Sequence, residues 1–234
     1  MRTVRTFLSF LAVNLLISVA PAQASSNEGI AAITIPSADV TMSFVQPGII
    51  AKILVKEGDK VNAKQLLIQQ DTEAAEASLA QKKVDLKRLE WIASRGSATD
   101  LEVEHARLDV KIAQIYLDNL CLKSPIEGTI DKIDVEVSEA VKGVDNVVRI
   151  VKTDPLWIDV PMPLAESRTL KIGQNIEVQF LDYEKKSSEG TVIYISTAAD
   201  AASSTLRVRI EVPNKSNRPS GEHVRVVFSN LKKT

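Results

Sequence analysis

The chain repeats one of its own stretches, and this repeat constrains the fold more than any other feature. The sequence GIIAKILVKEGDKV, from Gly48 to Val61, returns 80 residues later (48 to 128) as GTIDKIDVEVSEAV, from Gly128 to Val141. Both copies open on a turn and continue as a largely alternating, strand-like run. Two copies predict a domain made of two similar halves, because a solenoid needs at least three repeats. The identical positions are Gly48/Gly128, Ile50/Ile130, Lys52/Lys132, Ile53/Ile133, Val55/Val135 and Val61/Val141.

The segment between the two copies is helical in character. Residues 73–95 contain no Gly or Pro, and Gly96 stands where a left-handed residue ends a helix. Thr99 to Glu102 has the form of a capping box, which starts a second helix, and Ser124-Pro125 ends that helix. We expect an antiparallel coiled-coil hairpin over residues 72–120, with a reach of roughly 30 to 35 Å. Its apolar seam is expected at seven-residue spacing, on Leu79, Leu86 and Ala93 and on Leu101, Leu108, Ile115 and Leu122.

The last third of the chain predicts a small antiparallel β-barrel. Apolar and polar residues alternate in short runs around Val178, Val208 and Val226, and turns with Gly, Pro and Asn separate these runs. A strand from Ile30 to Ile35, which Pro36 is expected to stop, is well placed to complete the barrel.

Residues 1–24 have the pattern of a secretory signal. Arg2 and Arg5 form a positive start, Phe7 to Ala20 is mostly apolar, and small residues precede Ser25. The apolar run is shorter than the roughly 20 residues that a transmembrane helix needs. We therefore expect export with removal of this segment, and the alternative is its retention as a membrane anchor.

Composition and the reactive residue types argue against several classes of function. The formal net charge is −1 and no basic cluster occurs, so no nucleic-acid partner is expected. The only cysteine, Cys121, is expected to be a small buried residue, and the only histidines, His105 and His223, are expected on the surface. Trp91 and Trp157 are expected to be packing residues. No nucleophile elbow, phosphate loop or metal-spaced cluster occurs in the sequence, so we expect no enzyme activity, cofactor or metal.

The order of these parts resembles the periplasmic adaptor proteins of bacterial efflux and secretion pumps, the HlyD or membrane fusion protein family. The stretches that carry the resemblance are Gly48 to Asp71, Leu122 to Gly128 (LKSPIEG), Lys171 to Val178 and Pro219 to Gly221. The resemblance implies a mostly β protein with an α-helical hairpin. It implies a lipoyl-like (biotinyl-like) domain of residues 43–71 plus 122–154, the inserted hairpin of residues 72–120, and a barrel domain of residues 28–42 plus 155–231.

The resemblance also implies a function and a location. Adaptors of this kind lie in the periplasm and link an inner-membrane transporter, here most simply of the RND type, to an outer-membrane channel. Six copies in a ring are what the resemblance implies, and exported small molecules would pass through that ring. This interpretation makes the transporter, the channel and further copies of the chain the expected partners.

The resemblance places a channel contact near the tip of the hairpin. Adaptors of this family often carry an Arg, a Leu four residues later and a Ser seven residues beyond the Leu. The corresponding positions here hold Arg88, Ile92 and Thr99. The alternative interpretation assigns Arg88 to a solvated surface, Ile92 to the hairpin core and Thr99 to a plain N-cap.

Other functions stay open at this point. A lipoyl fold can carry biotin or lipoate on a Lys in the turn between its halves, but here residues 72–120 replace that turn and no Met-Lys-Met sequence occurs. A stand-alone periplasmic envelope protein is the second alternative. The chain also departs from the family pattern, because Lys64 and Ser138 stand where Gly is usual, the hairpin is short, and no fourth, membrane-proximal domain is expected.

Overall fold

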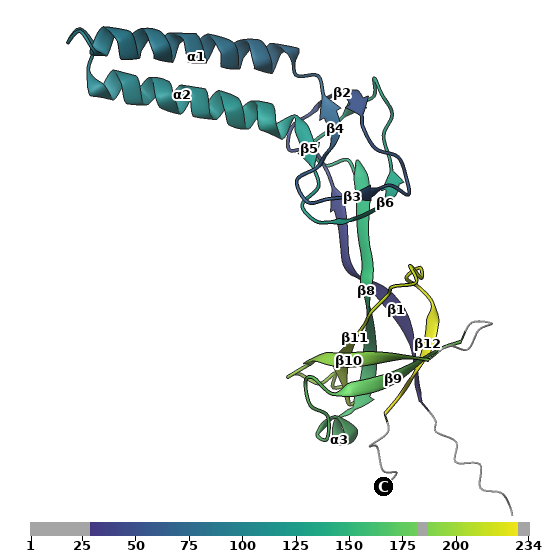
Figure 1. Cartoon of the computed structure of the whole chain (residues 1–234). Helices are drawn as coiled ribbons and strands as arrows, with labels where there is room; N and C mark the ends of the chain where they lie inside the picture. The colour runs from purple at the N-terminus through teal and green to yellow at the C-terminus, as the bar shows by residue number, and fades with distance from the viewer. Residues whose placement is uncertain (1–28, 182–186, 229–234) are drawn as a thin grey trace, which may run out of the picture.

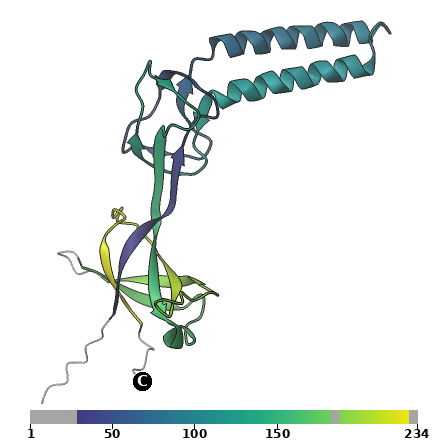
Figure 2. The ribbon, with the colours of Figure 1, turned by 180° about the vertical axis from the view of Figure 1, so that it is seen from behind.

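The structure, a computed structural model, describes residues 29–181 and 187–228, so the predicted signal of residues 1–24 lies outside the described residues. Three parts follow one another along the molecule: a helical hairpin, a small β domain and a β-barrel (Figure 1). The view from behind shows the hairpin projecting from the small β domain, away from the barrel (Figure 2). This mostly β architecture with one projecting hairpin confirms the predicted fold class.

The small β domain, which we call the split domain, contains both copies of the sequence repeat. Its strands are β2 (Gly48–Ile53), β3 (Lys60–Val61), β4 (Leu66–Gln70), β5 (Cys121–Lys123), β6 (Gly128–Ile133), β7 (Ala140–Val141) and the first part of β8 (Val148–Pro163). Strand β2 of the first copy pairs with β7 of the second copy, and β6 of the second copy pairs with β3 of the first. Each copy is thus completed by a strand from the other copy.

The pairing register follows the sequence repeat. Gly48 lies opposite Val141, and 80 residues along, Gly128 lies opposite Val61. The amide of Ile50 donates to the carbonyl of Glu139 at 2.9 Å, and the amide of Ile130 donates to the carbonyl of Asp59 at 2.9 Å. Both isoleucines are buried in one shared core. The two halves therefore form a pseudo-twofold unit that depends on both copies.

Ser138 and Lys64, which stand where the family pattern has glycine, adopt a backbone conformation that favours glycine. Gly58 has a φ of +88°, and Ser138, its counterpart in the second copy, has a φ of +74°. Lys64 also lies in the left-handed region, with a φ of 68°. Residues with a Cβ rarely adopt this conformation, so Ser138 and Lys64 retain the turn geometry at the expense of local strain.

The hairpin consists of α1 (Glu73–Ala93) and α2 (Asp100–Asn119). Gly96 has a φ of +73° and lies in the connecting turn, as predicted. Thr99 caps α2 in a complete capping box with Glu102, also as predicted. Among the described residues, no helix combines the length and the apolar character that crossing a bilayer requires.

The predicted seam of α2 is wrong. Helix α2 turns Val103 and Ala106 into the hairpin, whereas Leu101, Leu108 and Ile115 are exposed. Leu122 is buried, but it lies in β5, because the helix ends at Asn119. The sequence contains a second apolar series at spacings of three and four residues, and this series packs against α1: Val103, Ala106, Val110, Ala113 and Leu117.

The barrel closes from six strands in the order β1, β12, β9, β10, β11 and β8, with β8 pairing back to β1. The elements not yet given are β1 (Ile30–Met42), α3 (Leu164–Ser167), β9 (Asn175–Phe180), β10 (Ser187–Ile195), β11 (Thr205–Val212) and β12 (His223–Val227). Alternate residues of these strands, such as Val178, Val208 and Val226, fill the interior. The inward row of each strand is apolar because one face of a closed barrel is hidden from water.

A two-stranded ribbon joins the barrel to the split domain. Strands β1 and β8 pair over most of their length, and both continue from one part into the other (Figure 1). The predicted stop at Pro36 is wrong: β1 continues past it, with a register shift between Pro36 and Ala38. A proline is tolerated here because a bulge leaves one backbone position unpaired.

Candidate functional site

The candidate site is the tip of the hairpin, where the structure shows the side chains of Arg88, Ile92 and Thr99. Arg88 is exposed on α1 and forms an ion pair with Asp85, one turn earlier, at 3.1 Å. Ile92 is half-buried in the last turn of α1. Of these three side chains, the guanidinium of Arg88 is the most available to a partner, because an exposed i,i+3 pair is weak and exchanges readily with other acceptors.

Thr99 has a structural task at this site. Its hydroxyl oxygen accepts the amide of Glu102 at 3.3 Å, and its own amide donates to Oε2 of Glu102 at 2.7 Å. The hydroxyl also donates to Oε2 of Glu102 at 2.8 Å. These hydrogen bonds, first the one from the Thr99 backbone, lower the pKa of Glu102. Because Glu102 occupies the donor and the acceptor of the hydroxyl, the structure agrees better with the N-cap interpretation of Thr99.

Trp91 and Arg95 are two tip residues that the sequence analysis missed. The guanidinium carbon of Arg95 lies 3.7 Å from the centroid of the Trp91 ring, and the Trp91 ring is exposed. The prediction that Trp91 is a packing residue is therefore wrong. The signal in the sequence was an arginine four residues after an aromatic residue at the end of a helix. Exposed Trp and Arg side chains are typical of protein interfaces.

A shallow groove runs along one face of the hairpin. Lys82 of α1 and Asp109 of α2 bridge it with an ion pair of 2.9 Å, which raises the pKa of Lys82. On the side toward the tip, the groove has a volume of about 370 Å³ and is lined by Arg88, Glu102 and His105, among others. This tip-side part of the groove combines both charges with few large apolar groups, so it suits a polar contact with another protein.

The remaining reactive residue types form no chemical site in the part of the chain that the structure describes. Cys121 is half-buried, and burial raises the pKa of its thiol, which makes it a poor nucleophile. His105 and His223 are exposed, as expected. Among residues 29–181 and 187–228, no group of three or more His, Cys, Asp or Glu side chains is placed to hold a metal ion.

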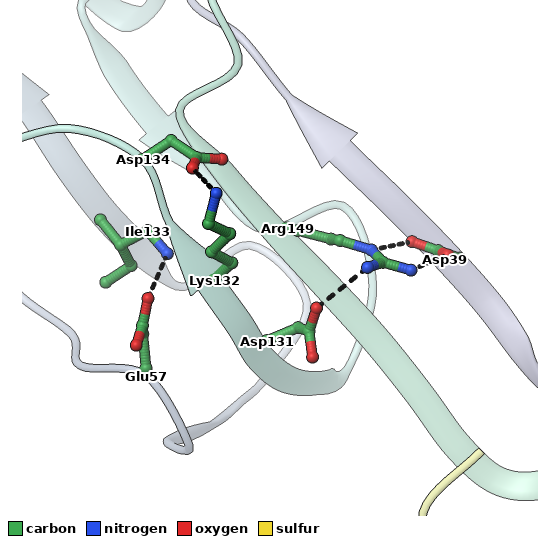
Figure 3. A network of polar contacts seen from close by, with 7 residues as sticks. All are labelled: Asp39, Glu57, Asp131, Lys132, Ile133, Asp134 and Arg149. Carbon is green, nitrogen blue, oxygen red and sulfur yellow. Dashed lines mark hydrogen bonds and ion pairs between the residues drawn. The ribbon is translucent and has the colours of Figure 1, made fainter. Parts of the chain in front are cut away.

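A polar network fixes the ribbon to the split domain (Figure 3). The guanidinium of Arg149 on β8 donates to both carboxylate oxygens of Asp39 on β1, at 2.9 and 2.6 Å, and to Asp131 on β6 at 3.1 Å. This bidentate pair lowers the pKa of Asp39 and raises that of Arg149. One side chain thus links three strands, β1, β6 and β8, at the point where the ribbon enters the split domain.

Two family models match this arrangement of parts. Residues 38–153 match the model described as "RND MFP, barrel-sandwich hybrid domain", and residues 155–229 match "CusB-like, beta-barrel domain". Together the two matches cover more than half of the chain. The chain belongs to the RND membrane fusion protein (MFP) family.

Individual relatives agree with this assignment. The antibiotic efflux pump periplasmic linker protein ArpA of Pseudomonas putida is 28% identical over 196 residues, which is 71% of this chain and 53% of ArpA. The membrane fusion protein Spr0693 of Streptococcus pneumoniae has a similar fold, with a TM-score of 0.65, 21% identity, and coverage of 86% of this chain and 99% of that protein. A chimera of MacA that contains the Pseudomonas aeruginosa MexA α-hairpin domain gives a TM-score of 0.68 at 18% identity, covering 84% and 78%. The RND membrane fusion protein described here spans about half the length of the curated relatives it matches.

Proposed function

We propose that this RND membrane fusion protein is a periplasmic adaptor that links an inner-membrane transporter, most simply of the RND type, to an outer-membrane channel for export of small molecules. The observation that carries the proposal is the order of the parts: a barrel and a split domain in one body, with a hairpin projecting from the far side (Figure 1). The relatives that this chain matches include efflux pump periplasmic linkers.

The three parts suggest a division of tasks. The barrel, with residues 28–42 and 155–231, docks on the transporter, and the split domain, with residues 43–71 and 122–154, packs against further copies in a ring. The hairpin of residues 72–120 reaches toward the channel. Helix α1 has 21 residues, so the hairpin extends by about 30 Å from the body. Residues 1–24 direct the chain to the periplasm.

At the hairpin tip, Arg88 contacts the channel, with Ile92 and Thr99 beside it. The exposed guanidinium supports this role for Arg88, since it presents several donors to carboxylates or carbonyl groups at the ends of a partner's helices. Ile92 supports the tip from its half-buried position, and Thr99 holds the start of α2 in place.

Affinity purification tests the proposal. The tagged protein, expressed in its own bacterium and purified from solubilised membranes, is expected to recover an RND-type transporter and a channel, identified by mass spectrometry. Recovery of the channel should fall roughly tenfold for Arg88→Glu, because reversing a contact charge at an interface costs more than about 1.4 kcal/mol. Lys215→Glu, an equal charge change in an exposed barrel loop, is the matched control and should recover the channel like the wild type.

The outcomes separate the two parts of the proposal. Purification that never recovers a transporter contradicts the adaptor function and favours a stand-alone envelope protein. Recovery of transporter and channel that neither Arg88→Glu nor Thr99→Asp changes removes the tip assignment alone.

A further inference from the structure

The end of the barrel that lies away from the split domain gathers several segments of the chain (Figure 1). Strand β1 begins at this end and β12 ends there. Pro163, at the end of β8, pairs with Thr205, at the start of β11. Residues 163–174, which include α3, and residues 196–204, which connect β10 to β11, therefore lie at this end too. We call these two segments the distal end of the barrel.

The distal end carries little charge. Its 21 residues include four charged side chains, and residues 196–204 include four alanines. By contrast, the connection between β9 and β10 starts from the opposite end of the barrel, and four of the seven residues 181–187 are charged. The charged side chains of the distal end balance in sign: Glu166, Arg168, Lys171 and Asp200.

Two large apolar side chains of the distal end are exposed. Leu164 of α3 and Ile172 of the turn before β9 are exposed by 41 and 69%. Neither is needed to close the barrel, because Leu170 packs into the barrel core and Ser167 is buried beside it. The barrel is thus complete without these two side chains, and their apolar surface is available to a partner.

The two cations of the distal end stand close to Ile172 in the sequence. Lys171 precedes it directly, Arg168 lies four residues earlier, and both are exposed. Within the described part of the chain neither forms an ion pair. The carboxylate of Asp200 is occupied by its own loop, since it accepts two backbone amides at 2.8 and 3.2 Å, so Glu166 is the acid that opposes the cations. Apolar side chains with long cationic ones beside them suit a lipid surface, because the cations reach the phosphates while the apolar groups insert.

The sequence that leads into this end also indicates a membrane. The mostly apolar run from Phe7 to Ala20 precedes β1, and only residues 21–29 lie between them. Such a connection spans at most about 35 Å, so the distal end stays within that distance of the bilayer while the run is in the membrane. Residues 229–234, which follow β12 at the same end, add Lys232 and Lys233.

We propose that the distal end of the barrel lies on the inner membrane, with Leu164 and Ile172 among the lipid headgroups and Arg168 and Lys171 at the phosphates. The partner is an anionic phospholipid surface. The inference deepens the proposed function and rests on it for the orientation of the molecule, because a hairpin that reaches toward an outer-membrane channel leaves the distal end facing the inner membrane (Figure 2). The contact then holds the barrel at a fixed height beside the transporter.

The contact is expected to be weak by itself. Each inserted apolar side chain, and each cation near anionic lipid, changes the binding constant by about five- to tenfold. The four groups together give an association constant on the order of 10³ M⁻¹. A contact of this strength needs a second attachment to be stable in the cell, and docking on the transporter supplies it.

Co-sedimentation of the whole secreted protein with sucrose-loaded vesicles tests the inference. Vesicles of phosphatidylethanolamine and phosphatidylglycerol, at about millimolar lipid, should bind roughly half of the wild type. Leu164→Asp with Ile172→Asp should lower the association constant roughly tenfold or more, because two inserting side chains are replaced by acids. Circular dichroism and thermal melting verify that this variant is folded, which its exposed positions predict. Val45→Asp with Val144→Asp makes the same change at two more exposed positions, in the split domain, and should bind like the wild type.

A pair of charge variants tests the cations. Lys171→Glu should lower binding to the phosphatidylglycerol vesicles roughly fivefold or more, whereas Lys215→Glu, in the loop of residues 213–222 at the opposite end of the barrel, should not. With vesicles of phosphatidylcholine alone, Lys171→Glu should bind like the wild type, because that surface carries no net charge.

A fluorescent label shows which part of the protein meets the lipid. In a Cys121→Ala background, an environment-sensitive dye on Ile172→Cys should shift to shorter wavelength when vesicles are added. The same dye on Val144→Cys should not shift, since Val144 lies in the split domain.

Four results overturn the inference. The first two are a wild type that does not bind at millimolar lipid, and a variant with Leu164→Asp and Ile172→Asp that binds vesicles like the wild type. The third is a variant that keeps vesicle binding but loses the transporter in the affinity purification, which assigns the distal end to the transporter. The fourth is a variant that sediments differently from the wild type without lipid, which assigns this end to a second copy. Recovery of the transporter without any vesicle binding contradicts this inference alone, and vesicle binding without recovery of a transporter contradicts the adaptor function.

Discussion

At the scale of single residues, the sequence repeat predicts positions that the chain fills imperfectly. Aligning the copies places Ser138 on Gly58, and the structure shows both in the left-handed region, with φ values of +74° and +88°. The sequence alone identifies Ser138 as the equivalent of Gly58. It does not show that Ser138 keeps the positive φ of the glycine, because the turn is held by hydrogen bonds between the two copies. One of these runs from the amide of Ser138 to the carbonyl of Ile50, at 2.8 Å.

We predict that Ser138→Gly stabilises the protein by about 0.5 to 1 kcal/mol. Glycine adopts a positive φ without the clash that a Cβ causes, and relief of this strain outweighs the extra freedom of the unfolded chain. The shift in the midpoint of urea unfolding measures the effect. Gly58→Ser, the reverse change in the other copy, should destabilise by a similar amount, since a Cβ at Gly58 would meet no atom within 4 Å and backbone strain is then the main cause of the change. Destabilisation by Ser138→Gly would show that the positive φ of Ser138 is not a strained conformation.

A second prediction concerns Arg149 and acid pH. The hydrogen bonds from Arg149 lower the pKa of Asp39, so their stabilisation is fully present above the pKa of an unfolded Asp, about 3.9, and is lost as the pH falls through the lower pKa of the folded state. Arg149→Gln should reduce the free energy of unfolding at pH 7 by less than about 1 kcal/mol, because the pair is partly exposed. The difference from the wild type should shrink below about pH 4. Urea unfolding across pH 3 to 7 measures it, and a difference that does not change with pH would show that packing, not charge, holds the ribbon.

At the scale of elements, sequence signals that depend on a few neighbouring residues predicted the helix ends correctly. The face of helix α2 that is buried could not be predicted in this way. The capping box at Thr99 and the left-handed Gly96 were confirmed, because both depend on residues within a few positions. The seam of α2 could not be chosen from the sequence, since Leu101 and Val103 each begin an apolar series of helical spacing. The larger apolar residues, Leu101, Leu108 and Ile115, lie on the exposed face of α2, although their size and apolar character alone would predict burial. The same argument explains why Trp91 was missed at the candidate site.

We predict that Thr99→Ala weakens the start of α2. The change removes the acceptor for the Glu102 amide and should cost about 1 kcal/mol of helix stability. Hydrogen exchange should show faster exchange for the amides of residues 100–103, with the amides of the last turns of α2, near the base of the hairpin, unaffected. Thr99→Ser keeps a hydroxyl and is the matched control, expected to exchange like the wild type. Equal exchange in both variants would mean that the capping box does not hold the first turn.

At the scale of the whole molecule, the repeat in the sequence predicted a domain of two similar halves, but not which strands those halves share. The structure shows that β2 of the first copy pairs with β7 of the second, and β6 of the second with β3 of the first. The long ribbon of β1 and β8 did not follow, because Pro36 ends a strand in most contexts and the bulge that accommodates it involves residues more than a hundred positions away. Tip contacts could be proposed only through the family resemblance, since a partner's surface leaves no pattern in one chain.

The last prediction separates the hairpin from the body. Strands β4 and β5 pair, with Gln69 opposite Cys121, and the amide of Gln70 donates to the carbonyl of Leu120 at 2.9 Å, so the hairpin leaves and rejoins the split domain at neighbouring points. Replacing residues 73–119 by a short Asn-Gly turn therefore closes β4 and β5 into an ordinary β-hairpin. Helices α1 and α2 contact mainly each other, so the body should lose no more than about 1 to 2 kcal/mol, measured by urea unfolding. In the affinity purification, this variant should still recover the transporter and no longer recover the channel. A body that fails to fold would show that the hairpin holds the two halves together, and loss of the transporter by a folded variant would contradict the assignment of the barrel to transporter docking.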